Sequence, residues 1–151
     1  MKLAEALIER AELQKKNAQL IQRITSNTKV QEGDKPAENP DSLIEEYDRN
    51  MDRLEVLIKK INETNSKIII DNKETISEII ARRDCIGSKI NAYRLFYESS
   101  TIRQERYSQK EVKFIRCIDA KKLQDTINML SKEYREIDTR LQGINWITEL
   151  L

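Results

Sequence analysis

The feature that most constrains the fold is a heptad repeat between Ala120 and Trp146. Apolar residues recur there at alternating steps of four and three, and nearly all positions between them are charged or amide residues. The repeat consists of Leu123, Ile127, Leu130, Tyr134, Ile137, Leu141 and Ile144. Such a helix would be about 40 Å long, and its narrow apolar stripe has to be buried against another long helix. The repeat therefore predicts a protein built from long paired helices.

Two further stretches carry a seam of the same kind. After Pro40 the seam residues are Ile44, Tyr47, Met51, Leu54, Ile58 and Ile61, with Asp41 or Ser42 as the expected N-cap. A capping box from Thr75 to Glu78 opens the next helix, which runs to about Ser99 and carries Arg83 on its seam. Because a buried arginine is costly unless it is paired, either the helix edge is open at Arg83 or a carboxylate lies opposite.

The remaining segments complete the expected architecture. A first helix from about Leu3 to Thr25 is followed by a loop at about 26–40. Two β-branched segments, 67–71 and 112–118, are expected to pair as a two-stranded antiparallel ribbon, because a lone strand leaves its backbone groups unpaired. Helices two and four should pair antiparallel, since their seams match in length. The predicted fold class is mainly α, with four helices in an elongated bundle and one domain over residues 1–151.

The composition excludes much chemistry. The chain has no histidine, which removes the commonest general base and metal ligand, and no glycine-rich phosphate loop is present. We therefore expect no enzyme, cofactor or metal. Cys85 and Cys117 lack CxxC spacing and are expected to be reduced, buried thiols, with a disulfide as the alternative. Neither a signal peptide nor a membrane span is recognisable, so a cytoplasmic protein is expected.

One group of candidate binding residues is basic. It comprises Arg82, Arg83, Asp84, Arg103, Arg106 and Tyr107. Arginines with an interleaved aromatic residue could hold the phosphates and stack on the bases of RNA. Glutamates interrupt the region, however, and the net charge of the chain is only +1. Salt bridges within or between subunits are therefore the interpretation that we favour.

A second group of candidate residues lies at helix ends. Asn65 falls where the seam of the second helix turns polar, which could fix register or simply end the helix. Asn145 and Trp146 close the fourth helix and could belong to a site. The favoured interpretation is that Trp146 anchors the tail by burying its ring.

Several short polar motifs resemble the bacterial septicolysin-like family over nearly the whole chain. The motifs are Met1–Leu7, Leu13–Lys16, Val30–Gly33, Pro36–Glu38, Arg82–Asp84, Arg106–Ser108 and Asn145–Trp146. Asn39-Pro40 departs from the pattern, in which an acidic residue precedes the proline. The resemblance implies a fold of long helices with a small β element and homo-oligomers, and its name implies a cytolysin.

The sequence alone thus favours a cytoplasmic interaction or scaffold protein that forms a dimer or higher homo-oligomer through helix faces. The heptads, the near-zero net charge and the missing catalytic residues support this prediction. A nucleic-acid or phosphate binder that uses the arginines is the first alternative. A membrane-active cytolysin is the second, against which the charged helices argue.

Overall fold

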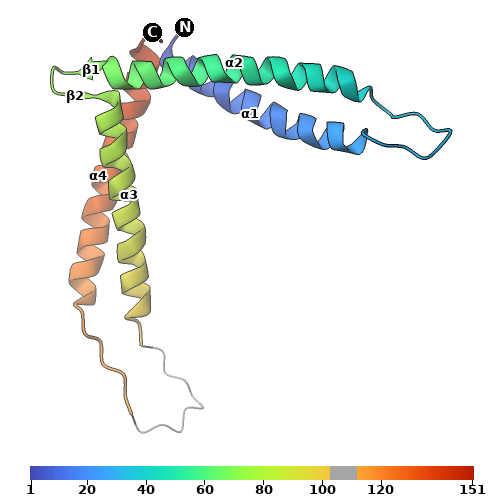
Figure 1. The fold of residues 1–151 in the computed structure, drawn as a ribbon. Helices are drawn as coiled ribbons and strands as arrows, with labels where there is room; N and C mark the ends of the chain where they lie inside the picture. Colours follow the sequence, from blue (N-terminus) through green and yellow to red (C-terminus); the bar gives the residue numbers. More distant parts are fainter. Residues whose placement is uncertain (103–111) are drawn as a thin grey trace. The chain divides into compact units, whose positions relative to one another are not determined.

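The computed structural model describes residues 1–102 and 112–151 of the chain (Figure 1). The four helices are α1 (Leu3–Ser26), α2 (Pro40–Lys67), α3 (Ile76–Ser99) and α4 (Ala120–Ile147). Two short strands, β1 (Ile69–Ile70) and β2 (Glu74–Thr75), form an antiparallel sheet. The described residues confirm the mainly α fold with four helices and one small two-stranded sheet.

The contacts group the chain into two compact units, and each is described by itself. The first contains Met1–Ile76 and Gln142–Leu151, and the second contains Ser77–Leu141. The helix α4 contributes residues to both. The single domain over residues 1–151 that the sequence predicts stays a prediction.

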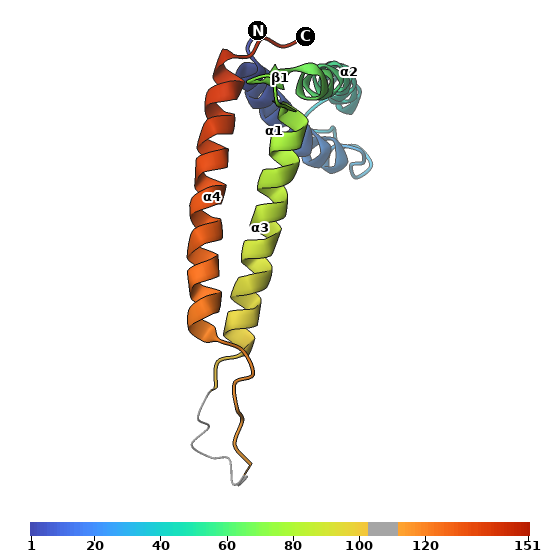
Figure 2. The same ribbon diagram turned by 90° about the vertical axis from the view of Figure 1, so that its left-hand side faces the viewer.

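Helices adjacent in sequence form the pairs. In the first unit α1 packs along α2, and the ion pairs Glu9–Arg53 and Lys16–Glu46 show that the two run antiparallel. In the second unit α3 and α4 lie side by side (Figure 2). The expected pairing of helices two and four is therefore wrong. Consecutive elements of a chain usually lie next to each other, and equal seam length does not decide the partner.

The seam of α4 is confirmed. Five of its seven residues are buried, and Leu123 and Tyr134 are half-buried. On α3 the residues Ile79, Ile86 and Ile90 are buried in the same way. The close spacing of α3 and α4 is set at Gly87, because a Cβ added there would lie 3.2 Å from the Tyr134 ring.

The predicted partner of the first strand is wrong. β1 pairs with β2, in the register Ile69 to Thr75 and Ile70 to Glu74, whereas residues 112–118 lie outside regular structure. Asp71 and Asn72 have φ of 53° and 55°, and the Lys73 amide donates to the Ile70 carbonyl at 3.1 Å. Asp and Asn tolerate this left-handed backbone, so a tight turn supplies a partner from the adjacent residues.

The start of α3 agrees with the sequence, because the helix begins directly after Thr75. At the start of α4 the Asp119 carboxylate accepts from the Lys122 amide at 3.1 Å. The cap of α2 was misplaced. Asn39 fills that position by accepting from the Asp41 amide at 2.9 Å, with Pro40 as the first helical residue.

Candidate functional site

The most distinctive surface is one side of the α1–α2 hairpin. There the buried face of α2 differs from the seam that the sequence predicted. Of the predicted α2 seam, Leu54 and Ile61 are buried. Ile44, Met51 and Ile58, which recur every seventh residue, are 42%, 40% and 37% exposed. The core is completed instead by Leu43 and Leu57, which lie outside the predicted seam. The helix therefore buries one part of its apolar stripe against α1 and leaves the other part uncovered.

The opposite side of the same hairpin is lined with ion pairs. The Arg53 guanidinium donates to both carboxylate oxygens of Glu9, at 2.6 and 2.8 Å, and lies across from α1. The Lys16 Nζ atom lies 2.7 Å from a carboxylate oxygen of Glu46. Arg23, in the last turn of α1, pairs with Glu38 in the connection to α2. The hydrogen bond from Arg53 holds the pKa of Glu9 below its ordinary value. The hairpin thus has one charged side and one apolar side.

Helical spacing places the uncovered residues of both helices on the apolar side. On α1 the residues Ala11, Ala18 and Ile21 are exposed. Around the helix axis they lie on one flank of the buried face, and Glu9 and Lys16 lie on the other flank. On α2 the row of Ile44, Met51 and Ile58 is likewise turned away from Glu46 and Arg53. We call these six residues the apolar row. Such a continuous uncovered stripe is the kind of surface that another helix covers.

A polar residue sits within the core beside this row. Asn17 is buried, and its side-chain nitrogen donates to the Met51 sulfur at 3.3 Å. Its Oδ1 atom has no hydrogen-bond partner among the described residues. A buried asparagine in a helix seam weakens packing but fixes which residues face one another.

Arg83, the arginine on the α3 seam, is paired with carboxylates, which was one of the two alternatives predicted from the sequence. Its Nη1 atom donates to Asp138 of α4 at 3.1 Å, and its Nε and Nη2 atoms donate to Asp84 at 2.9 and 2.8 Å. The Arg83 side chain is 25% exposed. Burial opposes its charge, but the hydrogen bonds to Asp84 and Asp138 outweigh burial and raise the pKa of Arg83 above its usual value. This guanidinium is already held by carboxylates of its own chain.

The other arginines of the proposed patch do not form a described site. Arg82 is exposed. Arg103, Arg106 and Tyr107 lie outside the described residues. Of the three candidates that the structure describes, Arg83 and Asp84 contact each other.

The helix-end candidates stand differently from their prediction. Asn65 and Asn145 are half-buried, whereas Trp146 is 55% exposed. The expectation that Trp146 anchors the tail by burying its ring is therefore wrong, because a ring anchor requires most of the indole to leave water. Both cysteines are free thiols, as expected, but they are exposed rather than buried.

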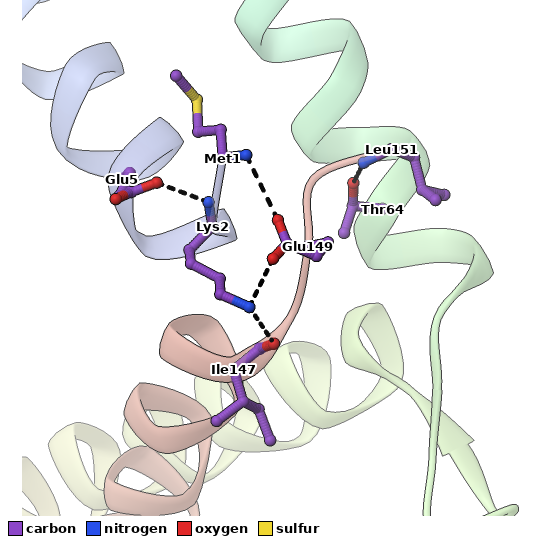
Figure 3. A network of polar contacts seen from close by, with 7 residues as sticks. All are labelled: Met1, Lys2, Glu5, Thr64, Ile147, Glu149 and Leu151. Atoms are coloured by element: carbon purple, nitrogen blue, oxygen red, sulfur yellow. Dashed lines mark hydrogen bonds and ion pairs between the residues drawn. The ribbon is translucent and has the colours of Figure 1, made fainter.

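The first and last residues of the chain are held by a network that sequence reasoning missed (Figure 3). Lys2 and Glu149 form an antiparallel bridge and an ion pair of 2.6 Å. The Met1 amino group lies 3.4 Å from the same carboxylate. Hydrogen bonds from Lys2 and then from this amino group lower the pKa of Glu149. No local pattern could reveal this pairing, because its partners are separated by nearly the whole chain.

Thr64 extends the same network. Its hydroxyl is fully buried, donates to the Lys60 carbonyl at 2.8 Å and accepts from the Leu151 amide at 3.0 Å. In the sequence, only the position of this threonine at the end of the apolar α2 seam hinted at a buried polar contact. The tail is therefore fixed by backbone and hydroxyl groups, and Trp146 is not needed for that purpose.

The described residues contain no candidate metal site. No cluster of three acidic or cysteine side chains within residues 1–102 and 112–151 could hold a metal ion. None of the helices described is apolar over a length that would cross a bilayer. What the described part of the chain offers is surface, of which the apolar row is the clearest.

A crystal structure from Corynebacterium diphtheriae is similar to this fold. It is described as a functionally unknown conserved protein and is 37% identical, with a TM-score of 0.94. The match covers 100% of this chain and 99% of that one. No curated protein matches the chain.

These comparisons correct the resemblance to septicolysin-like proteins. The similar structure carries no such description, and the family that matches is one without a known function. The cytolysin expected from that resemblance therefore loses its basis. Since residues 10–150 match its model, the chain belongs to the family of unknown function DUF6847.

Proposed function

We propose that this protein is a cytoplasmic helical interaction protein that self-associates through the apolar row. The observation that carries the proposal is the set of Ile44, Met51 and Ile58, which keep about two fifths of their surface exposed at heptad spacing. Residues at this spacing form a stripe along one side of a helix, and a second stripe of the same kind can pack against it. The row of α1 widens this stripe.

Self-association fits the distribution of charge on the hairpin. Glu9, Arg53, Lys16 and Glu46 are already paired across α1 and α2 on the other side. Docking a second apolar row would not require these four charges to lose water, and burying unpaired charge is costly. A homo-oligomer with two-fold symmetry uses the same patch on both subunits.

The test is the solution mass of matched variants at micromolar concentration. The chain has a mass of 17.8 kDa, and we expect a discrete multiple of it by light scattering. Ile58→Glu should shift the mass toward that of one chain, because it places a charge in the row. The matched control is Val56→Glu, since Val56 is 44% exposed on the same helix but points away from the row.

A single-chain mass for the unmodified protein would contradict the proposal, as would equal loss of mass in both variants. A single-chain mass would instead favour the alternative function, a nucleic-acid or phosphate binder that uses the arginines. It would then be tested by salt-dependent RNA binding of the same preparation, and Arg103→Ala with Arg106→Ala should weaken that binding.

A further inference from the structure

The segment Val112–Ile118 is an exposed apolar stretch with the composition of a strand. It reads Val-Lys-Phe-Ile-Arg-Cys-Ile, and residues of these types favour β structure. Val112, Phe114 and Ile115 are 82%, 87% and 84% exposed. Figure 2 shows the segment as an extended trace between the grey trace and α4. Three large apolar side chains that stand almost fully in water within seven residues call for a partner.

The described part of the chain gives this segment no strand to pair with. β1 and β2 pair with each other, and the described contacts of the segment include a hydrogen bond from the Arg116 side chain to the Ser100 carbonyl at 3.0 Å. Among the described residues no backbone hydrogen bond joins 112–118 to another strand. An extended edge of this kind is a template for another chain.

We propose that 112–118 pairs antiparallel with the same segment of a second copy, centred on Ile115. The pairing is two-fold symmetric, and all seven residues take part. On one face Val112 would lie opposite Ile118, and Phe114 opposite Arg116. On the other face Lys113 would lie opposite Cys117, and the two Ile115 side chains would meet. This inference concerns a different surface from the apolar row and does not depend on it.

Among pairings of the segment with its own copy, the positions of the two cations and of Phe114 favour this register. With Ile115 at the centre, neither cation faces another cation, and each Arg116 guanidinium meets a Phe114 ring, which attracts it. A parallel pairing in register would oppose Lys113 to Lys113 and Arg116 to Arg116. An antiparallel pairing centred on Lys113 or on Arg116 would place that residue opposite its own copy. Like charges that face each other destabilise strand pairs. The segment is thus complementary to itself in one arrangement that uses its full length.

Disulfide trapping tests the register in the full-length chain. Opposite residues of an antiparallel pair have Cα atoms about 4.5–5.5 Å apart, within the range that a disulfide spans. Ile115→Cys, made together with Cys85→Ser and Cys117→Ser, should give a covalent dimer under mild oxidation. The matched control, Phe114→Cys in the same background, places its two thiols out of register. It should give about tenfold less dimer, because a disulfide cannot bridge Cα atoms beyond about 7 Å.

A second pair of variants checks the same register independently. Lys113→Cys with Cys117 retained and Cys85→Ser should give a covalent dimer, since positions 113 and 117 face each other. The same variant with Cys117→Ser should not. Equal trapping at positions 114 and 115, or no dimer at any position, would overturn the proposal. Absence of dimer is also the result if 112–118 pairs within its own chain or with a different protein.

Combining the trap with Ile58→Glu separates this inference from the proposed function. A covalent dimer through position 115 that persists in the Ile58→Glu background supports strand pairing, whatever the apolar row does. Loss of the trapped dimer in that background alone would overturn the independence of the two surfaces. Failure of the trap with an unchanged solution mass would reject the strand pairing and leave helix-face association standing.

Discussion

The two helical hairpins place their charges differently. The α1–α2 hairpin keeps its ion pairs beside an apolar core, where Glu9, Arg53, Lys16 and Glu46 stay in contact with water. The α3–α4 hairpin carries a guanidinium on the seam itself, where Arg83 meets Asp138. Ion pairs in water contribute little to stability, whereas a pair taken partly out of water is costly to break. The first hairpin should therefore depend on its apolar residues, and the second on its packing and on one polar contact together.

Removing a core side chain from the first hairpin should have the largest effect. Leu57 is 1% exposed, so Leu57→Ala should lower the free energy of unfolding by about 2–5 kcal/mol through lost burial and a cavity. Val56→Ala, at the neighbouring exposed position, should change it by less than about 0.5 kcal/mol. Urea titration followed by circular dichroism measures both.

The same titration tests whether the chain is one domain. Because α4 supplies residues to both units, we expect Leu57→Ala to shift a single transition. Two separate transitions, only one of which moves, would show that the hairpins unfold independently and would contradict the single domain predicted from the sequence.

Packing in the second hairpin should be most sensitive at Gly87. A leucine there would drive its side chain into the Tyr134 ring, which already lies 3.2 Å from the position of a Cβ. We expect Gly87→Leu to cost about 1–3 kcal/mol. Adding Tyr134→Ala should recover part of this loss if the clash is the cause, and no recovery would point to a different one. Thermal unfolding of the two single variants and the double variant measures the coupling.

The two hairpins show which buried residues the sequence could predict and which it could not. The heptads of α3 and α4 identify their buried residues, because a narrow apolar stripe on a long helix has few ways to be covered. The carboxylate opposite Arg83 was one of two alternatives that the cost of burying a cation left open. By contrast, the α2 heptad could not say which part of its stripe faces α1. That choice depends on how the apolar residues of both helices pack, and Leu43 and Leu57 complete the core.

Long-range partners were the least predictable. The bridge between Lys2 and Glu149 and the contact of Thr64 with Leu151 join residues far apart in the chain, and no local periodicity reports on such contacts. The β hairpin was missed for the opposite reason. Its second strand, Glu74-Thr75, is only two residues long and shows no alternating pattern, and the left-handed turn at Asp71 and Asn72 brings it into place.

Breaking one ion pair in each hairpin should have smaller effects on stability, and the two losses can be compared directly. Asp138→Asn leaves the guanidinium of Arg83 on the seam with one carboxylate fewer, and should cost about 1 kcal/mol, between the values for exposed and buried pairs. Glu9→Gln, on the flank of the first hairpin, should cost about 0.5 kcal/mol or less. Equal losses by urea titration would contradict the distinction between a seam pair and a flanking pair.

The smallest effect expected is the dependence of the first hairpin on pH. Its flanking carboxylate, Glu9, has its pKa lowered from 4.5 in the folded chain by the hydrogen bond from Arg53. A carboxyl with a lowered folded pKa binds protons more readily when unfolded. Its stabilising contribution is therefore complete above the unfolded pKa and is lost as the pH falls through the folded one. The stability difference between the unmodified chain and Glu9→Gln should be constant from about pH 7 to pH 5.5 and shrink below about pH 4.5. A difference that grew on acidification would show that the pair does not stabilise the folded hairpin. High salt should diminish the neutral-pH difference, since solvent ions screen an exposed pair.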